Sequence, residues 1–136
     1  MNEQGHTWQR RFEGRPEQAR AVRAWVRNLL SDCMGNETVR AAELVASELF
    51  TAAGLDRDAA DMTVSTAGSR IRVYATSPEL LGVIDTHGPW RALVDGLTDT
   101  TGSDTHTLWA GLHDTPANGA SPSPPPHRRH PCPSRP

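Results

Sequence analysis

Lysine is absent from the sequence, and all 14 basic residues of the 136-residue chain are arginine. This absence excludes mechanisms that use a catalytic or Schiff-base lysine, and it excludes the lysine of a phosphate-binding P-loop. Cysteine occurs only at Cys33 and Cys132, which is too few for a disulfide framework or a cysteine-based zinc site. We therefore expect one hydrophobic core that needs no metal or disulfide.

Long apolar runs are also missing, and the mean hydropathy is −0.56. A transmembrane helix needs about 20 consecutive apolar residues, so no membrane span is predicted. Residues 1–12 are polar and lack the apolar segment of a secretory signal, which favours a cytoplasmic location. The formal net charge of −2 argues against nucleic acid as a partner, because domains that bind it are usually basic.

The composition changes near Asp114, and this change predicts a folded domain at 1–114 and a tail at 115–136. The tail holds eight of the 11 prolines and no Leu, Ile, Val, Phe, Trp, Tyr or Met. Such a segment cannot bury enough apolar area to offset its ordering entropy, so we predict that it is disordered. Its residues 121–126 are either inert or a polyproline II ligand.

Two helices and several strands are predicted within 1–114. Apolar residues recur at steps of three and four over 16–32, and a second, largely apolar helix is predicted over 37–53 with Asn36 as its N-cap and Gly54 at its end. Strands are predicted over 62–66, 70–76 and 105–112, with a hairpin turn at Ala67-Gly68 and an edge strand over 8–12. A weaker helical pattern covers 90–97. This order predicts an α+β two-layer sandwich, in which about three helices cover one face of a mixed, mostly antiparallel sheet.

The segment 42–53, with the sequence AELVASELFTAA, resembles the second helix of the ATP-binding domain that histidine kinases share with gyrase and a heat-shock chaperone. The nearest branch is that of the anti-sigma-factor serine kinases, and the resemblance extends over 12–112. Segments 71–78, 92–97 and 107–109 resemble later parts of the same domain. The resemblance implies the histidine-kinase-like ATPase fold, and it implies ATP and Mg²⁺ as ligands where the site is intact.

In this family the second helix carries a glutamate that acts as general base and, four residues later, an asparagine that holds Mg²⁺. The resemblance places Glu48 at the first position and Ala52 at the second. Residues four apart lie on one helix face, but an alanine methyl offers no lone pair, and Mg²⁺ needs oxygen ligands. Glu48 is therefore either a retained base or an ordinary helix residue, paired with Arg40 or Arg91.

The remaining family positions also depart from the pattern. The family's adenine-binding aspartate corresponds to Ala75, in the register fixed by Ser77, unless Asp85 takes that role in another register. A glycine pair that faces the phosphates corresponds to Gly88 and Trp90, where an indole obstructs close approach of the backbone. A strand threonine near the phosphates corresponds to Thr107.

Three functions follow from these observations as alternatives. The first is a regulatory protein-binding module with weak or no ATP turnover, whose partner is a sigma factor or an anti-sigma antagonist; proteins of this family are usually dimers. The second is an active serine/threonine protein kinase with Glu48 as base, and the third is a regulator that binds nucleotide without hydrolysis. For the first, Arg20, Arg23 and Arg27 are either a solvated face or a docking surface for an acidic partner, together with an apolar surface around residues 8 and 12.

Overall fold

The computed structural model describes residues 5–54, 58–77, 94–103 and 106–114. Within these ranges the chain forms, in order, β1 (His6–Glu13), α1 (Gln18–Leu30), α2 (Asn36–Gly54), β2 (Ala59–Ala67), β3 (Arg70–Thr76), β4 (Thr100–Ser103) and β5 (Thr107–His113). Residues 94–97 are also helical. The tail predicted at 115–136 lies outside the described residues.

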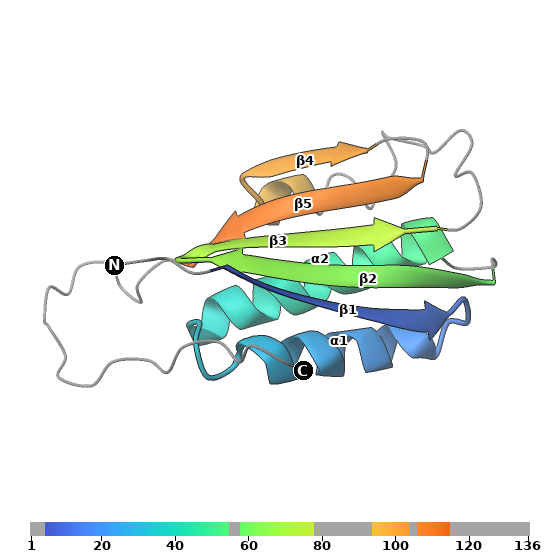
Figure 1. Ribbon diagram of the computed structural model, residues 1–136, viewed down its shortest axis with the longest axis horizontal. Coiled ribbons are helices and arrows are strands. Elements are labelled where there is room, and N and C mark those ends of the chain that lie inside the picture. Colours follow the sequence, from blue (N-terminus) through green and yellow to red (C-terminus); the bar gives the residue numbers. More distant parts are fainter. Residues whose placement is uncertain (1–4, 55–57, 78–93, 104–105, 115–136) are drawn as a thin grey trace, which may run out of the picture.

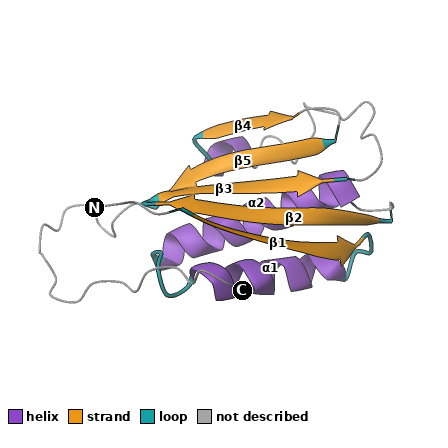
Figure 2. Ribbon diagram, in the orientation of Figure 1, coloured by secondary structure: helices purple, strands orange, loops and turns teal. Residues whose placement is uncertain are grey.

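The strands form one sheet in the order β1-β2-β3-β5-β4, and each of the described neighbouring pairs is antiparallel. Figure 1 shows α1 and α2 side by side along one face of this sheet, and Figure 2 shows the separation into a helical layer and a strand layer. The predicted α+β two-layer fold is confirmed. We call the sheet face that α1 and α2 do not cover the open face.

The helix α1 buries the apolar stripe that its sequence predicts, which consists of Val22, Trp25, Val26, Leu29 and Leu30. It begins at Gln18, two residues after Pro16, because the carbonyl of Arg15 accepts a hydrogen bond from Gln18 N in a preceding turn (2.9 Å). In α2, ten residues are buried between α1 and the sheet, which agrees with its apolar sequence. Gly54 ends α2 where a Cβ would lie 2.7 Å from Cβ of Ala60.

The strand β1 turns Trp8 and Phe12 toward the helices, where they are 1% and 2% exposed. Alternate residues of a strand face opposite sides of the sheet, and these two share the covered side. The Phe12 ring packs against the ring of Trp25 at 5.6 Å and that of Phe50 at 6.3 Å. The expectation of an apolar contact surface around these residues is therefore wrong, because both belong to the core.

The β2–β3 hairpin follows the prediction from Ala67-Gly68. Gly68 has φ of 61°, a left-handed conformation that glycine adopts without strain, and the two strands pair in register from Ala67↔Arg70 to Asp61↔Thr76. The strand β4 was not predicted. Its four residues are polar, and they pair with β5 from Thr100↔Gly111 to Ser103↔Leu108.

In the part of the chain that the structure describes, no helix combines the length and apolar character needed to cross a membrane.

Candidate functional site

The helix α2 carries Glu48 and Ala52 next to its buried side chains, and Ala52 packs partly against the core. Both are half-buried, and their i, i+4 spacing places them one turn apart on one face. Among the described residues the Glu48 carboxylate has neither a hydrogen bond nor an ion pair. The proposed pairing with Arg40 is not formed, and Arg91 lies outside the described ranges.

A groove of about 520 Å³ runs along the first turns of this α2 face. We call it the α2 groove; it is lined by Glu37, Arg40, Ala41 and Leu44 of α2, and by Leu97 and Leu112 opposite. Leu44 and Leu97 are 37% and 38% exposed, and they are the exposed large apolar side chains of the described residues. Glu48 lies one turn beyond Leu44, so the groove leads toward the position that the family resemblance marks as the base.

Ala75 lies on the helix-covered side of β3 and is fully buried. Its cross-strand neighbours are Met62 and Leu108, which are also fully buried. The methyl of Ala75, which the resemblance aligns with an adenine-binding carboxylate, is therefore surrounded by apolar core. Nothing in these surroundings offers a polar partner of that kind.

Ser77 follows β3 and is also buried, with 1% exposure. Its N–H donates to the carbonyl of His106 (2.8 Å), and its own carbonyl accepts from Nδ1 of His106 (3.3 Å). These two bonds tie the end of β3 to the start of β5. The backbone N–H and carbonyl groups of Ser77 are thus both hydrogen-bonded to His106 within the fold.

Thr107 lies on the open face, on the opposite side of the sheet from Ala75. Its Oγ1 lies 3.2 Å from Oγ1 of Thr76, its cross-strand neighbour, and alternation along the strand sends Leu108 to the covered side. The structure does not bring Thr107 together with Glu48. Gly88, Trp90 and Asp85 lie outside the described residues.

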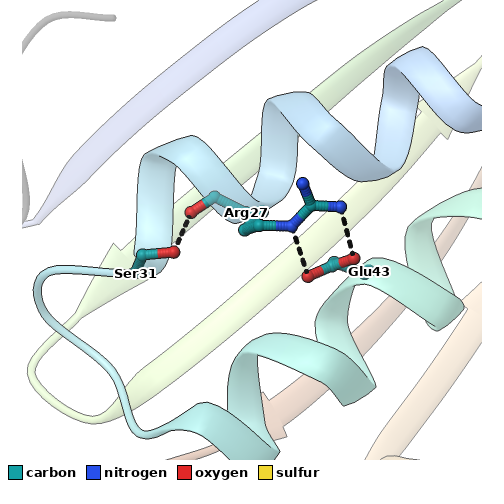
Figure 3. A network of polar contacts seen from close by, with 3 residues as sticks. All are labelled: Arg27, Ser31 and Glu43. Carbon is teal, nitrogen blue, oxygen red and sulfur yellow. Dashed lines mark hydrogen bonds and ion pairs between the residues drawn. The ribbon is translucent and has the colours of Figure 1, made fainter.

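The three arginines of α1 differ in their surroundings. Arg20 is exposed and Arg23 is half-buried. Arg27 forms a two-pronged ion pair with Glu43 of α2, with Nε–Oε2 and Nη2–Oε1 distances of 3.2 Å each, as Figure 3 shows. The hydrogen bonds and the negative charge of Glu43 raise the pKa of Arg27. Arg27 thus joins the two helices, and Arg20 and Arg23 are the arginines of α1 that have no ion pair within the described residues.

The open face holds a second group of side chains that the sequence analysis did not treat as a site. The guanidinium of Arg72 lies over the Trp109 ring, 4.8 Å from its centroid, and Tyr74 is the cross-strand neighbour of Trp109. The alternation of β3 and β5 places these residues on one face, but their neighbourhood depends on the strand order. That order is a tertiary property, so no local sequence signal identifies the cluster.

No protein-family model matches the chain, and no curated protein matches it. Inferences about its function therefore depend on its own residues and on their geometry. Of the positions that the resemblance marks, Glu48 and Ala52 share one helix face, Ala75 lies in the core, and Thr107 lies across the sheet.

Proposed function

We propose that this chain is a regulatory protein-binding module, similar to the domain of the anti-sigma-factor serine kinases, with weak or no ATP turnover. The partner would be a sigma factor or an anti-sigma antagonist, and the site of action the cytoplasm. The observation that carries the proposal is the half-buried methyl group of Ala52, one turn from Glu48 on the same face of α2.

The side chains at the family positions do not fit Mg²⁺ and ATP. Magnesium requires oxygen ligands, and phosphoryl transfer depends on the metal to neutralise developing charge. Ala52 supplies no oxygen and packs partly against the core. Ala75 supplies no acceptor for the adenine amino group, and burying that group unpaired costs about 1–3 kcal/mol. Loss of both contacts favours a module that binds protein rather than one that turns over nucleotide.

The charge on α1 supports an acidic partner. Arg20 and Arg23 have no ion pair within the described residues, and Arg20 is exposed to solvent. Arg27 is less suited to such a contact because Glu43 already neutralises it. We therefore restrict the proposed docking surface to Arg20 and Arg23.

A titration with Mg²⁺ and ATP tests the nucleotide side of the proposal. Ligand binding to the native state stabilises it by about 2.7 kcal/mol at a hundredfold excess over Kd, which a thermal melt detects. We expect no change in Tm at millimolar Mg²⁺-ATP. A clear rise in Tm contradicts the proposal, because it shows that the site binds nucleotide despite Ala52 and Ala75.

The variant Ala52→Asn restores the family's metal ligand at a half-buried position, and Ala52→Leu is its control of similar size without an oxygen. If Ala52 corresponds to the family's Mg²⁺-binding asparagine and a nucleotide can reach it, Mg²⁺-ATP raises the Tm of Ala52→Asn but not that of Ala52→Leu. Equal responses of the two variants argue that position 52 does not face a metal.

Affinity capture from the source cell, followed by mass spectrometry, tests the protein partner. We expect the double variant Arg20→Glu, Arg23→Glu to lose an acidic partner that the wild type retains. Arg10→Glu is the matched control, because Arg10 is an exposed arginine on β1, outside this helix face. A partner that survives the double variant binds elsewhere, and the docking surface is then wrong.

One observation favours the alternative of an active kinase. The Glu48 carboxylate is half-buried and has no partner in the described part of the chain, as a general base awaiting a substrate hydroxyl requires. Transfer of labelled phosphate to a protein substrate, lost in Glu48→Gln, would establish that alternative.

A further inference from the structure

A pocket of about 490 Å³ lies on the open face, across the ends of four strands. Its floor follows one cross-strand row, Ser65–Arg72–Gly111–Thr100, which runs from β2 through β3 and β5 to β4. Gly111 lets Thr100 approach closely in this row, because a Cβ at position 111 would lie 2.7 Å from Oγ1 of Thr100. The pocket therefore depends on the strand order that brings these four residues into one row, and its volume is typical of small-molecule sites.

Two arginines give the pocket its charge. Arg70 and Arg72 are two residues apart on β3, so both side chains point to the open face, and both line the pocket. Neither has an ion-pair partner in the described ranges. Arg11 on the same face, by contrast, is paired with Asp61 at 2.8 Å.

One acidic side chain, Asp99, also lines the pocket. Its Oδ2 is in contact with Nδ1 of His113, so this carboxylate is already engaged. The pocket is thus lined by two guanidinium groups, of Arg70 and Arg72, and by one carboxylate, of Asp99, so positive charge is in excess. The hydroxyls of Ser65 and Thr100 lie in the same row and add uncharged donors.

An aromatic surface adjoins the two arginines. Arg72 lies over the Trp109 ring at 4.8 Å, which holds its guanidinium in place. Tyr74, the next residue on this side of β3, also lines the pocket. The Tyr74 ring is half-buried and offers a surface against which a planar group can stack, whereas the Trp109 ring is already covered by Arg72.

We propose that this pocket binds a small ligand in which a phosphate group adjoins a planar ring, as in a mononucleotide. The planar forks of Arg70 and Arg72 match phosphate oxygens in pairs, and two cations suit a dianion better than a single carboxylate. Tyr74 supplies the stacking surface for the ring, and Trp109 holds the guanidinium of Arg72 in place. Glu48 and Ala52 are not among the residues that line this pocket, although the pocket meets the α2 groove at Asp99, Leu112 and His113, which line both.

Isothermal titration calorimetry of the full chain with adenosine monophosphate, without Mg²⁺, tests the proposal. We expect binding that weakens about tenfold in Arg72→Gln and in Arg70→Gln, which corresponds to about 1.4 kcal/mol for each lost charged contact. Arg11→Gln is the matched control on the same sheet face, and its affinity should stay within about twofold of wild type. No heat at millimolar ligand, or an equal loss in Arg11→Gln, overturns the proposal.

Amide chemical shifts locate the ligand independently of affinity and also reveal a variant that fails to fold. We expect adenosine monophosphate to shift the amides of Ser65, Arg72, Thr100 and Gly111 and the indole N–H of Trp109. Shifts centred on Glu48 and Ala52 instead assign the ligand to the α2 face and refute the open-face site.

Two further ligands separate the sources of the phosphate. Inorganic phosphate should bind more weakly than adenosine monophosphate, because it lacks the ring; equal affinity overturns the stacking part of the proposal. A single-stranded oligonucleotide should bind no more tightly per site than the mononucleotide. Much tighter, strongly salt-dependent binding of the oligonucleotide would identify a nucleic-acid surface and overturn the assignment of a small ligand.

Discussion

Substitution of Ala75 by aspartate tests whether position 75 lies in the core or faces a nucleotide cavity. In the structure Ala75 is fully buried between Met62 and Leu108, which are fully buried as well. An unpaired carboxylate in such surroundings costs about 3–5 kcal/mol. Because domains of this size are stable by about 5–15 kcal/mol, Ala75→Asp should remove a large part of the stability.

The assay is thermal unfolding followed by circular dichroism. For a domain of slightly more than 100 residues each kcal/mol lowers Tm by about 3–6 °C, so a cost of at least about 3 kcal/mol in Ala75→Asp should lower Tm by at least about 9 °C. Ala52→Asp is the control, because position 52 is half-buried and a carboxylate there keeps contact with water. Its cost should stay within about 1 kcal/mol.

The pH dependence of the same variant identifies the cause of the loss. Burial raises the pKa of a carboxyl, so the folded state of Ala75→Asp binds more protons than the unfolded state above about pH 4. The destabilisation should therefore grow as pH rises from about 4 to 7. An Ala75→Asp protein with the Tm of wild type at neutral pH refutes the reasoning, because it means that position 75 opens to a polar cavity, as an adenine site requires.

Two other substitutions test packing and charge. Gly102→Ala should destabilise the domain by about 1–3 kcal/mol in urea unfolding, because its Cβ would lie 2.4 Å from the Trp109 indole; Gly96→Ala, with nothing within 4 Å, is the control and should cause no loss. A double-mutant cycle of Arg27→Ala and Glu43→Ala should give a favourable coupling that decreases with salt; a coupling independent of salt would mean that the two side chains do not act as a charge pair.

Local patterns in the sequence predict much of this fold. The three- and four-residue spacing of α1 and the alternation of β3 and β5 place side chains on the sides where the structure has them. The hairpin follows from Gly68, whose positive φ is a local requirement. The strand β4 cannot be predicted from local patterns, because its four residues show no strand signal of their own and form a strand by pairing with β5.

The candidate site is less predictable, because side chains distant in sequence decide it. The i, i+4 relation of Glu48 and Ala52 is local, and it holds. The pairing of Arg27 with Glu43 depends on how two helices pack, so α1 alone gives no sign that this arginine is neutralised. The side of the sheet on which Thr107 lies depends on its register with Thr76.

The two sides of the sheet therefore differ in the kind of function they can support. On the helix-covered side, the buried methyl of Ala75 leaves no polar contact for a base, and any binding there depends on the face of α2 around Glu48. On the open face, Arg70 and Arg72 have no ion-pair partner in the described part of the chain, and Arg72 lies over the Trp109 ring. Arginines that have no ion-pair partner beside a pocket favour binding of an external ligand over a structural role. A ligand that shifts the amide signals of β3 and β5, but not those of α2, would assign the binding site to the open face.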